Sequence, residues 1–312
     1  MTRHAAIDCG TNAIRLLVAD VVNGRLTEVE RRMLTVRLGE GIDATGEFTQ
    51  AALQRTFAAV EEYAADIDRL GVRSTRMVAT SASRDARNAE EFISGVRDRL
   101  GIAPEVVAGT EEAELSFMGA VRGLSASLVE SPVLVADIGG GSTEFVSGNA
   151  EDGSISALCS IDVGCVRMTE RHLHDDPPSA EQVRATVDTI DALIDQALLA
   201  VPVDGVQTFI GLAGSVTTVA ALAHRFPTYD AAAIHGCLVT QDQVEEVTAR
   251  LLAMTRDQRA AEPVMHPGRV DVIAGGALVL RQILRRLPVD FVLASETDLL
   301  DGIVYRLAED VR

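Results

Sequence analysis

The sequence predicts an α/β protein built from two related halves, and three observations lead to this fold class. The chain has 312 residues, of which 47% are hydrophobic and 24% charged, a composition typical of a globular protein that is long enough for two cores. Short apolar runs alternate with longer segments of helical periodicity. A strand, turn and strand unit that centres on an aspartate and glycines occurs at the start of each half.

The first half opens with a predicted hairpin whose apolar strands flank the polar turn "DCGTN" and whose end is marked by Asn23-Gly24. Apolar residues at helical spacing then predict a helix over residues 49–70, and "TRMVATSASR" predicts a buried strand that runs into a polar loop. The segment "PEVVAGTEEAELSFMGAVRGL" predicts a strand, a turn and a helix with Thr110 as its N-cap.

The second half repeats the opening unit at "VLVADIGGGSTEFVSG" and adds a strand at "SISALCSIDVG". Helices are predicted to begin after Ser179 and Thr240, because a glutamine stands three residues beyond each in a capping box. The segment "VQTFIGLAGSVTTVAAL" predicts a strand, a glycine-rich turn and a helix, and "RVDVIAGGALVLRQILRRL" predicts a central helix because it is apolar nearly all round. We expect domains at residues 1–125 and 126–298, and a helix over 299–312 that packs back on the first domain.

Charge and composition limit the chemistry. The net charge of −18 argues against nonspecific binding to nucleic acid or to an anionic membrane. The chain contains no lysine, which excludes the P-loop lysine, the protein-kinase lysine and Schiff-base catalysis. Phosphate would therefore have to be recognised by backbone N–H groups, arginines and metal. No apolar stretch reaches the ~20 residues that span a bilayer, and no signal-peptide pattern precedes Asp8, so we expect a cytoplasmic protein.

Three polar turns follow predicted buried strands, at "DCGTN", "DIGGGSTE" and "GLAGS". An Asp-Gly turn alone is an ordinary hairpin, but the second turn has more glycines and polar groups than a chain reversal requires, which suggests a ligand. In this order the turns resemble the phosphate 1, phosphate 2 and adenosine motifs of the actin-like ATPase superfamily. The resemblance implies two ribonuclease-H-like domains that flank a central phosphate-binding cleft, in which glycines let N–H groups approach phosphate oxygens.

Within that superfamily the chain resembles the exopolyphosphatase and guanosine pentaphosphate phosphohydrolase (Ppx/GppA) family in its short two-domain form. The stretches "AIDCGTNAIRLLV", "VATSASRDARN", "VVAGTEEAELSFMG" and "DIGGGSTEFV" carry the resemblance, with support from "IHGCL" and "RVDVIAGGALVL". It implies hydrolysis of the terminal phosphoanhydride of inorganic polyphosphate with Mg²⁺ or alternatively Mn²⁺. Because the chain has few aromatic residues to stack a base, we expect short polyphosphate to be the preferred substrate. The alternative is a guanosine pentaphosphate phosphohydrolase of the stringent response; an ATP-dependent small-molecule kinase and a nucleotide-gated actin-like scaffold are more distant alternatives.

The resemblance also implies roles for single residues. Glu112 would be the catalytic base, whereas a Glu-Glu pair in a first helical turn otherwise only compensates the helix dipole, which stays the interpretation of Glu111. Asp137 and Glu144 would position the metal or the attacking water, with Asp8 opposite. A surface arginine is often only a solvated charge, which is the alternative for Arg84. The implied phosphate-binding residues are Gly10, Thr11, Asn12, Arg84, Asn88, Gly139, Gly140, Gly141, Ser142, Thr143, Gly214 and Ser215.

Two departures from the family pattern affect these expectations. Ala13 stands where the family often has a serine, so the first turn would rely on Thr11 and on its backbone. The sequence stops at Arg312, whereas long family members add a C-terminal helical domain, so we expect efficiency to fall on long polyphosphate chains. We further expect a homodimer, and neither nucleic acid nor a membrane as a partner.

Overall fold

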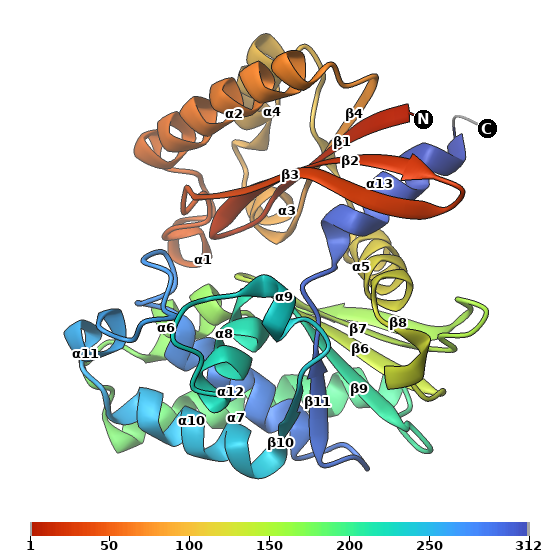
Figure 1. Cartoon of the computed structure of the whole chain (residues 1–312). Helices are drawn as coiled ribbons and strands as arrows, with labels where there is room; N and C mark the ends of the chain where they lie inside the picture. Colours follow the sequence, from red (N-terminus) through yellow and green to blue (C-terminus); the bar gives the residue numbers. More distant parts are fainter. Residues whose placement is uncertain (1, 311–312) are drawn as a thin grey trace. The chain divides into compact units, whose positions relative to one another are not determined.

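The computed structural model describes residues 2–310, which divide into two compact units (Figure 1). Unit 1 comprises Met1–Gly119 and Leu299–Arg312, and unit 2 comprises Ala120–Asp298. Each unit contains a mixed sheet covered by helices, so the predicted α/β class is confirmed. Across the described residues, no helix combines the length and the apolar composition needed to cross a membrane.

The sheet of unit 1 has the strand order β3-β2-β1-β4-β5 within the described residues. Its first three strands form an antiparallel meander, whereas β4 runs parallel to β1 and β5 runs parallel to β4. The C-terminal ends of β1, β4 and β5 therefore lie along one edge, where α/β sheets bind their ligands. The strands are β1 (Thr2–Cys9), β2 (Ala13–Val22), β3 (Arg25–Thr35), β4 (Ser74–Ala79) and β5 (Glu105–Val106).

Helices cover both faces of this sheet (Figure 1). One face packs against α2 and α4 through side chains such as Tyr63 and Phe92, and the other packs against α5 and α13 through Leu115 and Ile303. The helix α13 approaches α5 closely, since a Cβ at Gly302 would lie 2.0 Å from the carbonyl oxygen of Leu115. The described helices of unit 1 are α1 (Ile42–Thr45), α2 (Gln50–Leu70), α3 (Ser81–Asp85), α4 (Ala89–Leu100), α5 (Gly109–Gly123, shared with unit 2) and α13 (Leu299–Asp310).

The ends of these helices mostly follow the local sequence. Thr49 caps α2 by accepting a hydrogen bond from the Ala52 N–H, and Gly71 ends α2 in the left-handed conformation. The predicted N-cap of α5 is wrong, because the Glu112 N–H already bonds to the Ala108 carbonyl at 3.0 Å. Thr110 therefore lies inside the first turn, and the helix begins at Gly109.

The sheet of unit 2 repeats the plan of unit 1, with the order β10-β11-β9-β6-β7-β8 among the described strands. The strands β6, β7 and β8 form an antiparallel meander, β9 and β11 continue parallel to β6, and β10 pairs antiparallel with β11. The duplication predicted from the two aspartate turns is confirmed. The strands are β6 (Val133–Ile138), β7 (Thr143–Gly148), β8 (Ile155–Ile161), β9 (Thr208–Leu212), β10 (Leu238–Thr240) and β11 (Phe291–Ala294).

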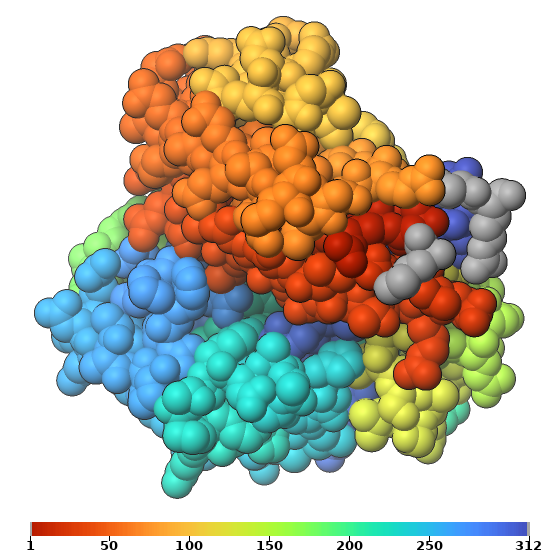
Figure 2. Space-filling model, turned by 45° about the horizontal axis from the view of Figure 1, so that its top comes forward, coloured from red at the N-terminus to blue at the C-terminus, as the bar shows by residue number. Residues whose placement is uncertain are grey.

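The helices of unit 2 surround α12, in which every residue except Arg281 is buried, as its uniformly apolar sequence predicts. Both predicted capping boxes are present, at Ser179 with Gln182 and at Thr240 with Gln243. The space-filling view shows the cyan segment that follows α8 beside the light-blue segment around α11 (Figure 2). The described helices are η1 (Ala126–Leu128), α6 (Cys165–His172), α7 (Ala180–Ala200), α8 (Ala213–Ala223), α9 (Ala231–Ile234), α10 (Gln241–Ala253), α11 (Arg256–Ala260) and α12 (Ile273–Leu284).

Candidate active site

The first turn joins β1 to β2 and places Asp8 directly across the ladder from Arg15. Asp8 is 4% exposed, and its Oδ2 accepts two hydrogen bonds from Arg15, at 2.8 Å from Nε and at 2.6 Å from Nη2. Hydrogen bonds between ionised groups are the strong ones, so the chain itself supplies a cation for this buried carboxylate. The predicted metal residue of unit 1 is therefore held in an ion pair.

The backbone of the first turn is braced by the loop that follows β3. The Gly10 N–H closes the turn on the Ala13 carbonyl at 3.0 Å, and the Thr11 carbonyl accepts from the Gly39 N–H at 2.9 Å. The Asn12 carbonyl accepts from the backbone N–H groups of residues 36 and 37. A Cβ at Gly39 would lie 2.4 Å from Thr11 Cγ2, so this close approach requires glycine. The predicted phosphate-binding residues Gly10, Thr11 and Asn12 thus share one rigid turn.

Glu112 and Arg84 lie together although 28 residues separate them. Arg84 Nη1 donates to Glu112 Oε2 at 2.8 Å and to the Val107 carbonyl at 3.0 Å. The topology explains this meeting, since α3 follows β4 and α5 follows β5 at the same sheet edge. Glu112 is only 7% exposed, so the ion pair fixes the orientation of a nearly buried carboxylate.

The neighbouring Glu111 has a different environment. Its side chain is 45% exposed and pairs with Arg76 at 2.6 Å, in a surface network that also includes Glu105. Such exposed ion pairs contribute little to stability, and this one lies on the solvent side of α5. The two glutamates are neighbours in the sequence but differ in environment. Glu112 is almost buried, and Glu111 is exposed to solvent.

Asn88 makes hydrogen bonds of a structural kind. Its Oδ1 accepts from the Phe48 N–H at 2.8 Å, and its Nδ2 donates to the Phe48 carbonyl at 3.1 Å. The amide therefore holds the start of the segment before α2, and a phosphate contact by Asn88 would have to replace these two bonds.

The second turn joins β6 to β7 with the same construction as the first, because the Gly139 N–H bonds to the Ser142 carbonyl at 3.0 Å. Here the residue opposite Asp137 is Glu144, and these side chains are 6% and 1% exposed. Glu144 accepts a hydrogen bond from the Ser160 hydroxyl at 2.7 Å. Residues directly opposite each other in a ladder share one face of the sheet, and like charges there are unfavourable. The arrangement fits a bound cation.

The carbonyl groups of the second turn are bonded by the start of α6. The Gly139 carbonyl accepts from the Cys165 N–H at 3.0 Å, and the Gly140 carbonyl from the Val166 N–H at 2.9 Å. In a planar trans peptide, the N–H of the next residue points opposite to the carbonyl. The N–H groups of residues 140, 141 and 142 therefore point away from α6. Successive N–H groups with this orientation form a nest for an anion such as phosphate.

Arg167 completes this anchor and was not predicted from the sequence. It is 8% exposed, its Nε donates to the Gly141 carbonyl at 2.7 Å, and its N–H reaches the Gly140 carbonyl at 3.1 Å. A Cβ at Gly164, the residue before α6, would lie 2.3 Å from the Gly140 oxygen, so glycine is required there. The one available signal was "VGCVR", a glycine at the end of the predicted strand "SISALCSIDVG" and ahead of a short amphipathic segment.

The third turn follows β9, which pairs in parallel with β6 so that Leu212 lies level with Asp137. Ala213 adopts the left-handed conformation with φ 68°, a strained choice for a residue with a Cβ. Ser215 is 6% exposed, and burial raises the pKa of the Cys165 thiol against the smaller opposite effect of the Ser215 hydroxyl. Both side chains pack against Gly276 of α12, where a Cβ would lie 2.1 Å from Ser215 Oγ and 3.1 Å from Cys165 Cβ, so Cys165 brings the second turn next to the third.

Arg269 lies on the third turn and is a second residue that the sequence did not single out. A Cβ at Gly214 would lie 2.4 Å from Arg269 Nε, and Arg269 Nη1 donates to the Thr218 hydroxyl at 3.0 Å. Its guanidinium carbon stands 5.5 Å from the centre of the Tyr229 ring. The Tyr229 hydroxyl bonds in turn to Glu296 at 2.6 Å, so this cation is held on three sides.

A metal site made of protein groups alone is absent from the described residues, where no three His, Cys, Asp or Glu residues are grouped to hold an ion. Mg²⁺ rarely needs such a cage, because it usually takes one or two carboxylates and completes its shell with water and substrate phosphate. The Asp137 and Glu144 pair has this character. The chemistry of the donor set therefore fits a metal that arrives with a phosphate ligand.

The chain is similar to a protein family and to curated proteins. The sequence model of the Ppx/GppA phosphatase family matches residues 17–311. The chain is 47% identical to Exopolyphosphatase 2 of Mycobacterium tuberculosis, over 99% of both proteins. It is 27% identical to the guanosine-5'-triphosphate,3'-diphosphate pyrophosphatase of Photobacterium profundum, over 99% of this chain and 60% of that protein.

A solved structure matches the whole chain. The Ppx/GppA family member of Aquifex aeolicus, 28% identical, superposes with a TM-score of 0.83 over 100% of this chain and 99% of that chain. The predicted fold class, two actin-like α/β domains, is therefore confirmed.

Proposed function

Because the chain belongs to the Ppx/GppA phosphatase family, we propose that it is an exopolyphosphatase, which hydrolyses the terminal phosphoanhydride of inorganic polyphosphate and releases orthophosphate. Its similarity to a relative named Exopolyphosphatase 2 along the whole length supports this choice. The observation that carries the proposal is the second turn, whose carbonyl groups are fixed by α6 so that its N–H groups form a nest for phosphate.

In this proposal Glu112 is the catalytic base. The carboxylate would accept a proton from water while the water oxygen bonds to the terminal phosphorus and the bond to the bridging oxygen breaks. The shortened polyphosphate leaves with the bridging oxygen. Arg84 holds one oxygen of Glu112, which would place the guanidinium charge beside the base and the phosphate that it attacks.

The proposed metal is Mg²⁺, with Mn²⁺ as the alternative, held by Asp137 and Glu144. When bound, it would neutralise phosphate charge beside these acids. Asp8, which is already paired with Arg15, would contribute through a water molecule rather than directly. In unit 2 the glycines of the second turn and the hydroxyls of Ser142 and Ser215 would contact phosphate oxygens, and in unit 1 the turn of Gly10 and Thr11 would do the same. The predicted phosphate contact of the Thr143 hydroxyl does not fit, because this hydroxyl is buried and donates to the Val163 carbonyl at 2.6 Å.

The proposed preference is for short inorganic polyphosphate over guanosine pentaphosphate and ATP. A site of N–H groups and arginines reads phosphate oxygens, and Arg269 rather than an aromatic ring covers Gly214 on the third turn. Aromatic residues make up only 4% of the chain, so few rings are available to stack a base. The similarity to a guanosine pentaphosphate hydrolase keeps that activity as the second candidate.

The test is a phosphate-release assay at one fixed salt and Mg²⁺ concentration. It compares kcat/KM for polyphosphates of several lengths, guanosine pentaphosphate and ATP. We expect the highest value for short polyphosphate and a decline as the chains lengthen. A clear preference for guanosine pentaphosphate would make the second candidate the principal activity, and the absence of phosphate release from all three would contradict the proposal.

The proposal also includes a cytoplasmic homodimer that binds neither nucleic acid nor membranes. The net charge of −18 supports the lack of polyanionic partners. Light scattering after size exclusion tests the dimer, and cell fractionation tests the location.

A further inference from the structure

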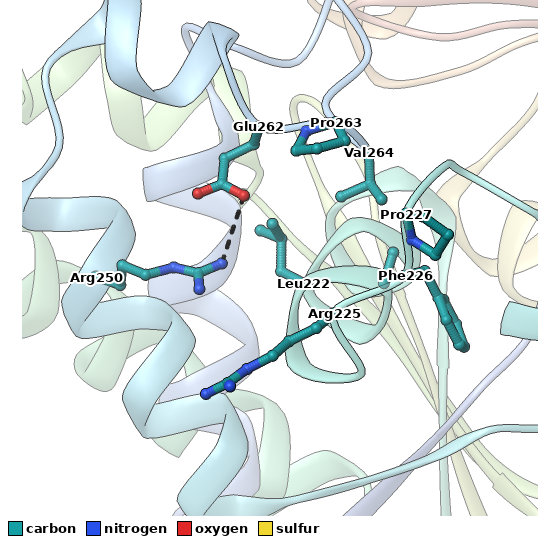
Figure 3. Close-up of a pocket in the computed structure, with 9 residues that line it drawn as sticks. Leu222, Arg225, Phe226, Pro227, Arg250, Glu262, Pro263 and Val264 are labelled. Carbon is teal, nitrogen blue, oxygen red and sulfur yellow. Dashed lines mark ion pairs between the residues drawn. The ribbon is translucent and has the colours of Figure 1, made fainter.

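Unit 2 contains a pocket of about 240 Å³ that the proposed function does not use (Figure 3). It lies between the C-terminal end of α8, the last turns of α10 and the segment that follows α11. A smaller pocket of about 200 Å³ adjoins it and shares Leu222, Arg225 and Arg250. The larger pocket is lined by Ala221, Leu222, Arg225, Phe226, Pro227, Arg250, Glu262, Pro263 and Val264.

The two arginines of this pocket are held loosely. Arg250 comes no closer to Glu262 than 3.8 Å, and Arg225 no closer to Glu246 than 3.8 Å, so neither contact is a hydrogen bond. Within residues 2–310, Arg250 Nε is buried and has no hydrogen-bond partner. By contrast, arginines such as Arg15 and Arg84 bond their carboxylates at 2.6 to 2.8 Å. A guanidinium carries five N–H donors, so both pocket arginines have donors to offer to a ligand.

The lining of the pocket has two chemically different sides. In Figure 3 the guanidinium groups of Arg225 and Arg250 lie on one side, and Phe226, Pro227 and Val264 lie on the other. The Phe226 ring is fixed by a stacked contact with His224, with ring centroids 5.6 Å apart. Arg225 is held at a left-handed φ of 53°, a strained conformation for an arginine. The site therefore offers a charged wall opposite a rigid apolar wall.

A simpler explanation for the two arginines is that their positive charges only compensate the negative C-terminal ends of the α8 and α10 helix dipoles. That explanation accounts for their charge but not for the buried Nε or for the apolar surface opposite. A ligand with a planar anionic group can take up guanidinium donors in pairs, and an apolar body can cover the opposite wall. Inorganic phosphate would satisfy only one of the two sides.

We propose that this pocket binds a small amphipathic organic anion, with its carboxylate group on Arg250 and Arg225 and its apolar body against Phe226, Pro227 and Val264. Glu262 then lies next to the anionic group, where it disfavours ligands with more than one negative charge. The site is independent of the proposed phosphatase activity, because none of its residues takes part in the turns that carry that activity.

The test uses benzoate as the probe, in calorimetric titrations of the full chain in a buffer free of phosphate, so that no other anion competes for the two arginines. Benzamide, which has no charge, and acetate, which has no ring, are the matched probes. We expect benzoate to bind with a Kd of about 1 mM, and each matched probe to bind at least ~10-fold more weakly.

Variants then locate the binding. Arg250→Gln and Arg225→Gln should each weaken benzoate binding about 10-fold, and Phe226→Ala about 5-fold. The control is Arg97→Gln, which alters an exposed arginine in the last turn of α4 and should leave the Kd unchanged. Thermal melting identifies any variant that fails to fold, and the other arginine variant then decides. Equal affinity in the wild type and the arginine variants, or no saturable binding below about 20 mM, would overturn the proposal.

Discussion

The first and second turns have the same backbone and opposite electrostatics. In both, a glycine N–H closes the turn at 3.0 Å, and in both the penultimate residue of the preceding strand is a buried aspartate. The residue directly across the ladder is Arg15 in the first turn and Glu144 in the second. A duplicated unit has thus kept its geometry while one position changed from a cation to an anion. The first aspartate is paired with an arginine of the chain, whereas the second pair of acids would share an external cation in our proposal.

Removal of divalent metal should have the largest effect. If the second turn depends on Mg²⁺ to neutralise phosphate beside Asp137 and Glu144, excess chelator should lower phosphate release to background, by about 1,000-fold or more. Added Mg²⁺ should restore it. The measurement is the steady-state rate on short polyphosphate, with thermal melting as the control for folding. Full activity in chelator would show that the two acids need no metal.

The next effect concerns the acids of unit 1. Glu112→Gln keeps the size of the side chain and an acceptor for Arg84 but removes the base, so kcat should fall by about 100-fold or more while KM changes little. Glu111→Gln is the matched control, because this neighbour is 45% exposed and pairs with Arg76 at the surface. Its kcat should stay within about twofold of the wild type. Similar losses in both variants would remove Glu112 from its role.

The comparison of the two turns is tested most directly by their acids. Glu144→Gln leaves an acceptor for the Ser160 hydroxyl but removes a charge from the proposed metal pair, so the half-saturating Mg²⁺ concentration should rise about 10-fold. Asp8→Asn should raise it by only about twofold, since Arg15 already neutralises that carboxylate. A Mg²⁺ titration of the rate gives both numbers. Equal shifts would mean that the turns are electrostatically equivalent, contrary to the comparison.

The smallest effect is expected at the third turn, where a cation stands over a glycine. Tyr229→Phe keeps the ring beneath Arg269 and removes the hydroxyl that bonds to Glu296. Because one hydrogen bond contributes about 1 kcal/mol, KM for polyphosphate should rise about fivefold while kcat stays within twofold. An unchanged KM would show that Arg269 does not need this support.

Features with local signals could be predicted from the sequence. The capping boxes at Ser179 and Thr240 were predicted correctly, because a hydroxyl and a glutamine three residues apart bond to each other's backbone wherever they occur. The two aspartate hairpins were also predicted, since their strands are buried on both faces and read as continuous apolar runs. In each case the interacting groups lie within a few residues of one another.

The missed features depend on partners far along the chain. The strand β3 lies at the edge of its sheet, and its charged side chains pair with distant residues, such as Arg31 with Asp301. Its sequence therefore lacks the simple alternation of apolar and polar residues that predicts a strand. The helix α6 has only eight residues, and its first N–H groups bond to the second turn rather than to a cap in the local sequence. Arg167 was missed with it. The pair of Arg84 and Glu112 was predicted as two residues, but their contact needed the parallel order of β4 and β5.

Because α13 belongs to unit 1, this unit cannot be completed until residues beyond 298 have been synthesised. Unit 2 is one continuous segment, whereas a hydrophobic core of unit 1 joins Ala6 and Leu17 from the first hairpin to Leu299 and Ile303 from α13. A chain that ends after residue 298 contains all of unit 2 but lacks the helix that covers one face of the first hairpin. Limited proteolysis of such a truncated chain should accordingly cut the first hairpin region and spare residues 120–298. Unit 1, whose first strands are synthesised first, therefore needs the helix α13 to complete one of its hydrophobic cores.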